Sequence, residues 1–193
     1  MSQQWLISIA IVALAAILGL GVILIYNRLV KGRQLVREGW SGIDVQLKRR
    51  ADLIPNLVEV VRGYATHEQT LLEELTRLRG ATLQAATVAE HRDVADRMQA
   101  ALQQLFVVAE AYPNLKADQS FLGLQNELVN LEDQIQMARR YYNGTVRDQN
   151  IRIESFPSNV VAGLFGFGIA EYFGIENGAD RQVPSARVGR TGA

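Results

Sequence analysis

The chain is poor in histidine and cysteine, two residue types that often bind metals or act in catalysis. It has two histidines, His67 and His91, and no cysteine, which excludes thiolate nucleophiles, disulfides and cysteine-based metal sites. A bundle that binds two iron ions would need Glu-x-x-His pairs, and the sequence has none. Both histidines fall in the first turn of an expected helix among polar residues, where a solvated imidazole is the simpler interpretation. The sequence therefore predicts no catalytic residue, no cofactor, no metal ligand and no enzymatic activity.

Basic side chains are the next candidates, because clusters of them bind nucleic acid. The densest run, residues 48–50, is flanked at helical spacing by Asp44 and Asp52, which favours an ordinary charged helix face. Residues 139–142 read Arg-Arg-Tyr-Tyr, but Tyr142 falls on an apolar stripe and is more simply explained as core. The chain has 20 Lys and Arg against 20 Asp and Glu, so no net charge draws it to nucleic acid. We expect no nucleic-acid partner.

Two asparagines, Asn143 and Asn150, lie one heptad apart and therefore on the same face of a helix. A buried asparagine at such a position fixes the register of helix packing at some cost in stability. We expect this structural role for both residues rather than a ligand site.

Beyond the N-terminal segment, the apolar residues recur at steps of three and four, which is the spacing of amphipathic helices. The first stripe covers residues 36–65 and keeps its register through Pro55, which predicts one long helix kinked at that proline. Gly39 and Gly42 would each weaken this helix by about 1 kcal/mol. We therefore expect a neighbouring element to pack closely beside Trp40.

Sequence signals also predict the limits of the second and third helices. Thr66 with Gln69, and Thr87 with Glu90, have the spacing of capping boxes and predict the two starts. Residues 80–87 are small and polar, which predicts a weak connector between the two helices.

The fourth helix has the clearest pattern. Pro113 predicts the end of the third helix, Asp118 can cap the fourth, and its apolar stripe covers residues 121–142. The pattern ends before Pro157, and strand alternation appears nowhere convincingly. The predicted fold is all-α: an elongated antiparallel bundle of three to four long helices that follows an N-terminal transmembrane helix.

That transmembrane helix is predicted from residues 5–26, an uncharged and mostly aliphatic run. A helix of this length spans roughly 33 Å, enough to cross a hydrocarbon core of about 30 Å. Trp5 and Tyr26 stand at its two ends, where their rings would favour the membrane–water interface. A cleaved signal peptide would need a basic start and a small-residue cleavage site, so a permanent anchor is favoured.

The flanks of this segment predict its orientation. No basic residue precedes it, and four cations follow it: Arg28, Lys31, Arg33 and Arg37. The positive-inside bias places the N-terminus outside and the bundle in the cytoplasm of a bacterial cell, with one pass through the inner membrane. The cations would also favour anionic lipid headgroups.

Residues 158–175 differ from the rest of the chain because they are rich in glycine and aromatic residues. Five Gly or Ser and one acid make a second membrane span unfavourable. We expect an exposed apolar patch that docks on the membrane surface or on a neighbouring subunit and helps assembly. The candidate assembly residues are Phe165, Phe167, Tyr172 and Phe173.

These observations divide the chain into five segments. They are a short tail (1–4), the transmembrane helix (5–26), the helical bundle (27–157), the Gly- and aromatic-rich amphipathic segment (158–175) and a tail predicted to be disordered (176–193).

Four stretches resemble the LemA family of bacterial membrane proteins. They are YNRLV at residues 26–30, the block from Trp40 to Glu68, AYPNLKADQSFLGLQNEL at 111–128 and ARRYYNGTVRDQNIRIESFPSNVVA at 138–162. The resemblance covers nearly everything from the anchor to about Phe173, and residues 43–68 are its most specific part. The family-motif residues, for which a structural role is expected, are Trp40, Asp44, Gln46, Leu47, Arg50, Asp52, Pro55, Asn56, Tyr64, Glu68, Tyr112, Pro113, Arg140, Tyr142, Asn143, Asn150 and Pro157.

The resemblance implies a membrane anchor, a helical-bundle domain and no established enzymatic activity. With the periodicity, it predicts a non-enzymatic membrane-anchored scaffold, with coiled-coil-like packing, that forms homo-oligomers and organises or presents other membrane proteins. An alternative is a regulatory adaptor or accessory subunit of a membrane enzyme, for example a protease, or of envelope-stress signalling. A ligand-binding sensor is a third possibility. The expected partners are the lipid bilayer, further copies of the chain and other membrane proteins.

Overall fold

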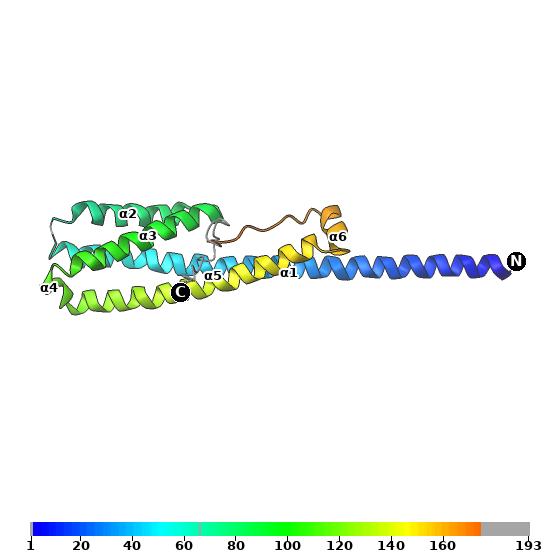
Figure 1. Ribbon diagram of the computed structural model, residues 1–193, viewed down its shortest axis with the longest axis horizontal. Coiled ribbons are helices and arrows are strands. Elements are labelled where there is room, and N and C mark those ends of the chain that lie inside the picture. Colours follow the sequence, from blue (N-terminus) through cyan, green and yellow to red (C-terminus); the bar gives the residue numbers. More distant parts are fainter. Residues whose placement is uncertain (1, 66, 175–193) are drawn as a thin grey trace, which may run out of the picture.

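A computed structural model describes residues 2–65 and 67–174 of the chain (Figure 1). These residues form six helices and none of them lies in a strand, which confirms the predicted all-helical fold. The tail predicted to be disordered, residues 176–193, lies outside the described residues.

Helix α1, Ser2–Arg62, is a single helix of 61 residues that runs from the apolar N-terminal segment into the bundle. It passes through Pro55 without ending, which confirms the prediction of one long element. Its two halves have different surroundings: the N-terminal half extends alone beyond the bundle, and the C-terminal half packs within it (Figure 1). The predicted stripe is buried at Ile43, Leu47 and Ile54.

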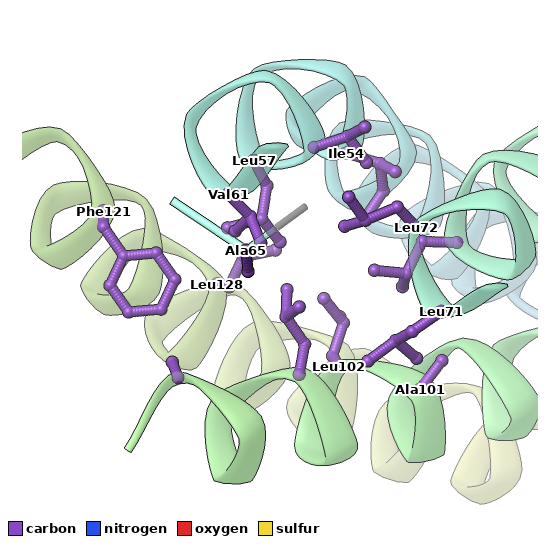
Figure 2. Packing of buried hydrophobic residues seen from close by; sticks show 14 of the residues in the cluster. Ile54, Leu57, Val61, Ala65, Leu71, Leu72, Ala101, Leu102, Phe121 and Leu128 are labelled. Carbon is purple, nitrogen blue, oxygen red and sulfur yellow. The ribbon is translucent and has the colours of Figure 1, made fainter. Parts of the chain in front are cut away.

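The bundle is completed by α2 (Gln69–Gln84), α3 (Val88–Ala109), the short α4 (Pro113–Lys116) and α5 (Gln119–Glu154). Helix α5 runs antiparallel to α1 along most of its length (Figure 1). Figure 2 shows the core at the end of the bundle that lies farthest from the N-terminus, where side chains of α1, α2, α3 and α5 converge. Leu128 and Leu131 of α5 are each 3 % exposed, as their stripe predicts.

The predicted helix starts are confirmed at two positions and wrong at one. The Thr87 hydroxyl accepts a hydrogen bond from the Glu90 N–H and Glu90 bonds back, which is the expected capping box. Asp118 accepts bonds from two N–H groups in the first turn of α5. The predicted Thr66 cap is wrong: α2 has Glu68 at its N-cap, without a side-chain cap, and Thr66 lies outside the described residues.

The connector predicted at residues 80–87 is also wrong in part. Helix α2 continues through Gly80 to Gln84, and only residues 85–87 separate it from α3. Leu78 and Thr82 are buried, so tertiary packing of this last turn offsets the low helix propensity of Gly80.

Glycine allows α1 and α5 to approach each other closely. A Cβ on Gly39 would lie 3.1 Å from the Cα of Tyr142, so a larger residue would fit only if the two backbones moved apart by a few tenths of an ångström. One heptad earlier, a Cβ on Gly32 would lie 1.9 Å from the Gln149 Oε1. The close packing predicted beside Trp40 is thus confirmed at Gly39, whereas the prediction is wrong for Gly42, which faces open space.

The chain turns back after α5. Helix α6, Ser158–Leu164, lies beside α1 at the point where α1 leaves the bundle (Figure 1). Residues 165–174, which we call the strap, then return along the bundle (Figure 1).

Candidate functional site where α1 leaves the bundle

The N-terminal half of α1 carries an uncovered apolar surface. Side chains from Gln3 to Leu20 are all exposed, and the most apolar 18-residue window has a mean hydropathy of 2.9 with none of it buried. In the part of the chain that the structure describes, α1 is the one helix long and apolar enough to cross a membrane. Trp5 is 72 % exposed near its start. Leu29 is the first buried side chain among those described.

A group of four basic side chains follows this apolar half of α1. We call it the collar; it consists of Arg28, Lys31, Arg33 and Arg37, which are all exposed. The Arg33 guanidinium carbon lies 4.9 Å from the centre of the Phe167 ring, so one cation of the collar also holds the strap. Tyr26, predicted at the membrane interface, packs its ring 4.8 Å from that of Phe165.

Two asparagines of α5 bind the strap through its backbone. The Asn150 amide donates to the Ala170 carbonyl at 2.9 Å and accepts from the Ala170 N–H at 2.8 Å. Asn143 makes the same pair of bonds with Phe173, at 2.8 and 2.9 Å. Seven helical residues and three extended residues both advance by about 10 Å, so the two pairs match in spacing. Both asparagines are predicted to fix the register of helix packing, and their observed hydrogen-bond partner is instead the strap.

The strap ends in an aromatic cluster. Phe173 is 1 % exposed; its ring centre lies 6.0 Å from that of Trp40, and the Arg139 guanidinium carbon lies 4.8 Å from the Phe173 centre. The Tyr142 hydroxyl donates to the Glu171 carbonyl at 2.7 Å, and burial raises the pKa of Tyr142. The core position predicted for Tyr142 is confirmed, at 3 % exposed.

The prediction of an exposed aromatic patch in residues 158–175 is wrong for part of the segment. Phe167 and Phe173 are buried against the chain's own α1 and α5, and Tyr172 is half-buried. Phe165 remains 53 % exposed. The hydrogen-bonding partners of the strap backbone explain the difference, because Asn143 and Asn150 lie too far from it in sequence for local patterning to reveal them.

His91 and Arg50 also depart from their predicted surroundings. The His91 ring is buried, 6 % exposed, with its centre 5.1 Å from that of Trp40, so it is not a solvated histidine. Arg50 is 2 % exposed, which contradicts the prediction of an ordinary charged face for residues 48–50. His67 is exposed, as predicted.

Hydrogen-bond acceptors inside the bundle compensate the charge of Arg50. Its guanidinium donates to the Glu132 carboxylate at 2.9 Å, to the Ala95 carbonyl at 3.1 Å and to Gln99 at 3.4 Å. Burial lowers the pKa of Arg50, and Glu132 opposes that shift. The sequence did contain a signal, because Arg50 lies three residues after Leu47 on the apolar stripe.

The remaining motif residues lie along the bundle. At the end far from the collar, the Tyr64 hydroxyl donates to Asp118 at 2.9 Å, which raises the pKa of Tyr64, and the Tyr112 hydroxyl donates to Glu68 at 3.2 Å. Asp44 pairs with Lys48 at 2.7 Å, as expected. Of the other motif residues, Leu47 is buried, Gln46 is half-buried and lies beside Arg49, and Pro113 begins α4. The exposed motif residues are Asp52, Pro55, Asn56, Arg140 and Pro157. Within the described residues, no group of three or more His, Asp or Glu is arranged to hold a metal ion.

The fold and these sites define an all-helical protein in which one helix, α1, forms both a candidate membrane span and part of the bundle. Residues 39–187 match the sequence model of the LemA family, and the chain belongs to this family. It is 24 % identical over 174 residues to each of the magnetosome proteins MamQ 1 and MamQ 2 of Paramagnetospirillum magneticum, covering 77 % of this chain and 64 % of each relative. Protein LemA of Metamycoplasma hominis is 27 % identical over 140 residues, covering 70 % of this chain and 63 % of the relative. The chain thus spans slightly less than two thirds of these relatives.

Proposed function

We propose that the protein is a non-enzymatic, membrane-anchored scaffold that self-associates and presents its bundle to other membrane proteins. The observation that carries this proposal is the continuity of α1, since one helix of 61 residues serves as both the apolar span and the longest element of the bundle. A helix without a break transmits position and tilt, so the bilayer would fix where the bundle stands. The relatives named MamQ and LemA carry no enzyme name, which agrees with a structural role.

Self-association would use the exposed sides of α1 and α5. Apolar side chains remain exposed along α1 and α5, including Val45, Val129 and Met137, which are 48 %, 54 % and 54 % exposed. Single exposed apolar residues are ordinary on a monomer. In a bundle held at one height by a membrane span, however, they would meet their counterparts in neighbouring copies side by side.

The test of self-association is the mass of the full chain extracted from membranes with its lipids in polymer-bounded discs. Discs that contain several copies and no other protein would support the scaffold. Copies joined to a different membrane protein would favour the alternative of an adaptor or accessory subunit. A single copy alone would refute the proposal.

We also propose that the N-terminus faces outward and that the bundle lies in the cytoplasm, anchored in the inner membrane of a bacterial cell. The support is the collar of four cations on one side of the span and their absence on the other. Because the chain has no cysteine, a single Val107→Cys on exposed α3 reports the side directly. A membrane-impermeant thiol reagent should label it only after cells are opened, and rapid labelling of intact cells would reverse the orientation.

A further inference from the structure

The apolar side chains that remain exposed at the membrane-proximal end gather on and around α6. Phe156, Val160, Leu164 and Phe165 are 83 %, 54 %, 75 % and 53 % exposed. Val160 and Leu164 are four residues apart and share one face of α6, while Val161 and Ala162 are buried against α1. We call these four exposed residues the foot.

The foot lies level with the end of the candidate span. Val161, Ala162 and Phe167 pack against Ile25, Tyr26 and Leu29, and the Phe165 ring lies against that of Tyr26. In Figure 1, α6 is the last element beside α1 before α1 continues alone. One helical turn advances about 5.4 Å, and the headgroup layer adds about 6 Å beyond the hydrocarbon core. Residues 25–29 and the foot therefore fall within the headgroup layer whenever the span crosses the bilayer.

The charges around the foot suit an anionic surface. Arg28 of α1 and Arg152 of α5 line one hollow of about 190 Å³ beside Pro157 and Ser158, and the described residues give neither arginine a carboxylate partner. The other cations of the collar stand close by along α1. Glu154 is the acid of the last turn of α5, and among the described residues it forms no ion pair with these cations.

We infer that the foot inserts its apolar side chains into the interfacial layer of the leaflet from which α1 emerges, while Arg28 and Arg152 bind lipid phosphates. This inference rests on the membrane anchoring proposed above and adds a second membrane contact. A single helix leaves a protein free to rotate and tilt about its axis. A foot beside that helix fixes which face of the bundle points toward the membrane plane and which faces point toward neighbouring proteins.

The test uses the full chain in lipid nanodiscs of phosphatidylcholine with a minority of phosphatidylglycerol. Single cysteines replace Val160 or Leu164 and carry a nitroxide spin label. The matched controls are Ile17→Cys in the span and Val107→Cys on the bundle, which replace side chains that are 67 % and 72 % exposed. Collision with oxygen, which concentrates in lipid, is compared with collision with a nickel chelate, which stays in water.

Labels at residues 160 and 164 should collide more often with oxygen than with the chelate. Their oxygen-to-nickel collision ratio should lie between the ratios of the Ile17→Cys and Val107→Cys controls. In the Val160→Cys chain, adding Phe156→Ser and Leu164→Ser should lower the oxygen-to-nickel ratio several-fold. If the labels at residues 160 and 164 give the same collision ratio as the label at 107, while the label at 17 lies in lipid, the insertion of the foot is refuted and the membrane anchor is retained. Shielding of 160 and 164 from both reagents would show a covering protein and also refute the foot. An aqueous signal at 17 would overturn the anchor and the foot together.

Discussion

At the scale of single residues, the most consequential departure from an ordinary helical bundle is the buried Arg50. An isolated guanidinium in this core would be very costly, and three acceptors from α3 and α5 compensate for its burial. Removing one partner of such a pair costs more than forming the pair gains, because the other charge is then left buried without a countercharge.

Glu132→Gln should destabilise the bundle, because it leaves Arg50 buried without a countercharge. Loss of one partner of a fully buried pair costs about 3–5 kcal/mol, and we expect roughly 2–3 kcal/mol here because the Glu132 side chain is 21 % exposed. Chemical denaturation of the full chain in detergent micelles measures the difference. The matched control is Glu127→Gln on the exposed side of α5, which should change stability by less than about 0.5 kcal/mol. Equal losses in the two variants would contradict this account of Arg50.

Asp118 makes a pH-dependent contribution at the start of α5. The Phe121 N–H, then the Tyr64 hydroxyl, stabilise its carboxylate and lower its pKa below the ordinary value of 3.8. A carboxylate with a lowered pKa contributes stability that is complete above its unfolded pKa and is lost as the pH falls through the folded pKa. The melting temperature of Asp118→Asn should therefore lie below that of the wild type at pH 6 and approach it by about pH 2. A constant difference over this range would show that the carboxylate charge plays no part.

At the scale of elements, the close crossing of α1 and α5 beside Trp40 depends on Gly39 and not on Gly42, which lies three residues further along α1. Gly39→Ala should cost about 1–3 kcal/mol, since the new Cβ would meet the Tyr142 backbone at 3.1 Å, which a side-chain rotation cannot relieve. Gly42→Ala should instead stabilise the chain by about 0.5–1 kcal/mol, because the site is open and alanine favours the helix. Thermal melts of the two variants give the comparison, and the same sign of change in both would refute the close crossing.

The strap is held by backbone recognition, so removing one asparagine should release it without unfolding the bundle. Asn150→Ala leaves the Ala170 N–H and carbonyl without their partners. Hydrogen exchange at the Ala170 amide should become about 10–100-fold faster, which corresponds to about 1.4–2.8 kcal/mol. Asn130→Ala, on the exposed side of α5, is the control and should leave this amide unchanged. Unchanged exchange in Asn150→Ala would mean that the other contacts of the strap, those of Asn143, Tyr142 and the aromatic rings, hold it without Asn150.

Local periodicity predicts much of this architecture. The stripes of α1 and α5, the Thr87 and Asp118 caps and the continuity through Pro55 all follow from spacing within one element. The features that local periodicity does not predict depend on contacts between elements that are distant in sequence. Arg50 and His91 lie on apolar stripes but read as polar, and the burial of Phe173 depends on Asn143, which lies 30 residues away.

At the scale of the whole molecule, three features fix the bundle relative to the proposed bilayer. The unbroken α1 sets its height, the strap ties the α6 end to the bundle, and the foot adds a second contact beside the span. A scaffold gains from this combination because neighbouring copies would meet at matched heights and with matched faces. In this arrangement the apolar span and the bundle would move as one rigid body.

The distance between spin labels on either side of the proposed membrane boundary measures this rigidity. Val22→Cys and Val45→Cys replace exposed side chains of α1 at 39 % and 48 % exposure, and the chain has no other cysteine. In nanodiscs, with labelled chains diluted among unlabelled ones, an unbroken helix predicts a narrow distribution centred near 35 Å. The pair Ile9→Cys and Val22→Cys, near 20 Å, is the control within the span. A broad distribution for the first pair, or one centred below about 30 Å while the control stays narrow, would show a hinge at the membrane boundary and contradict the account.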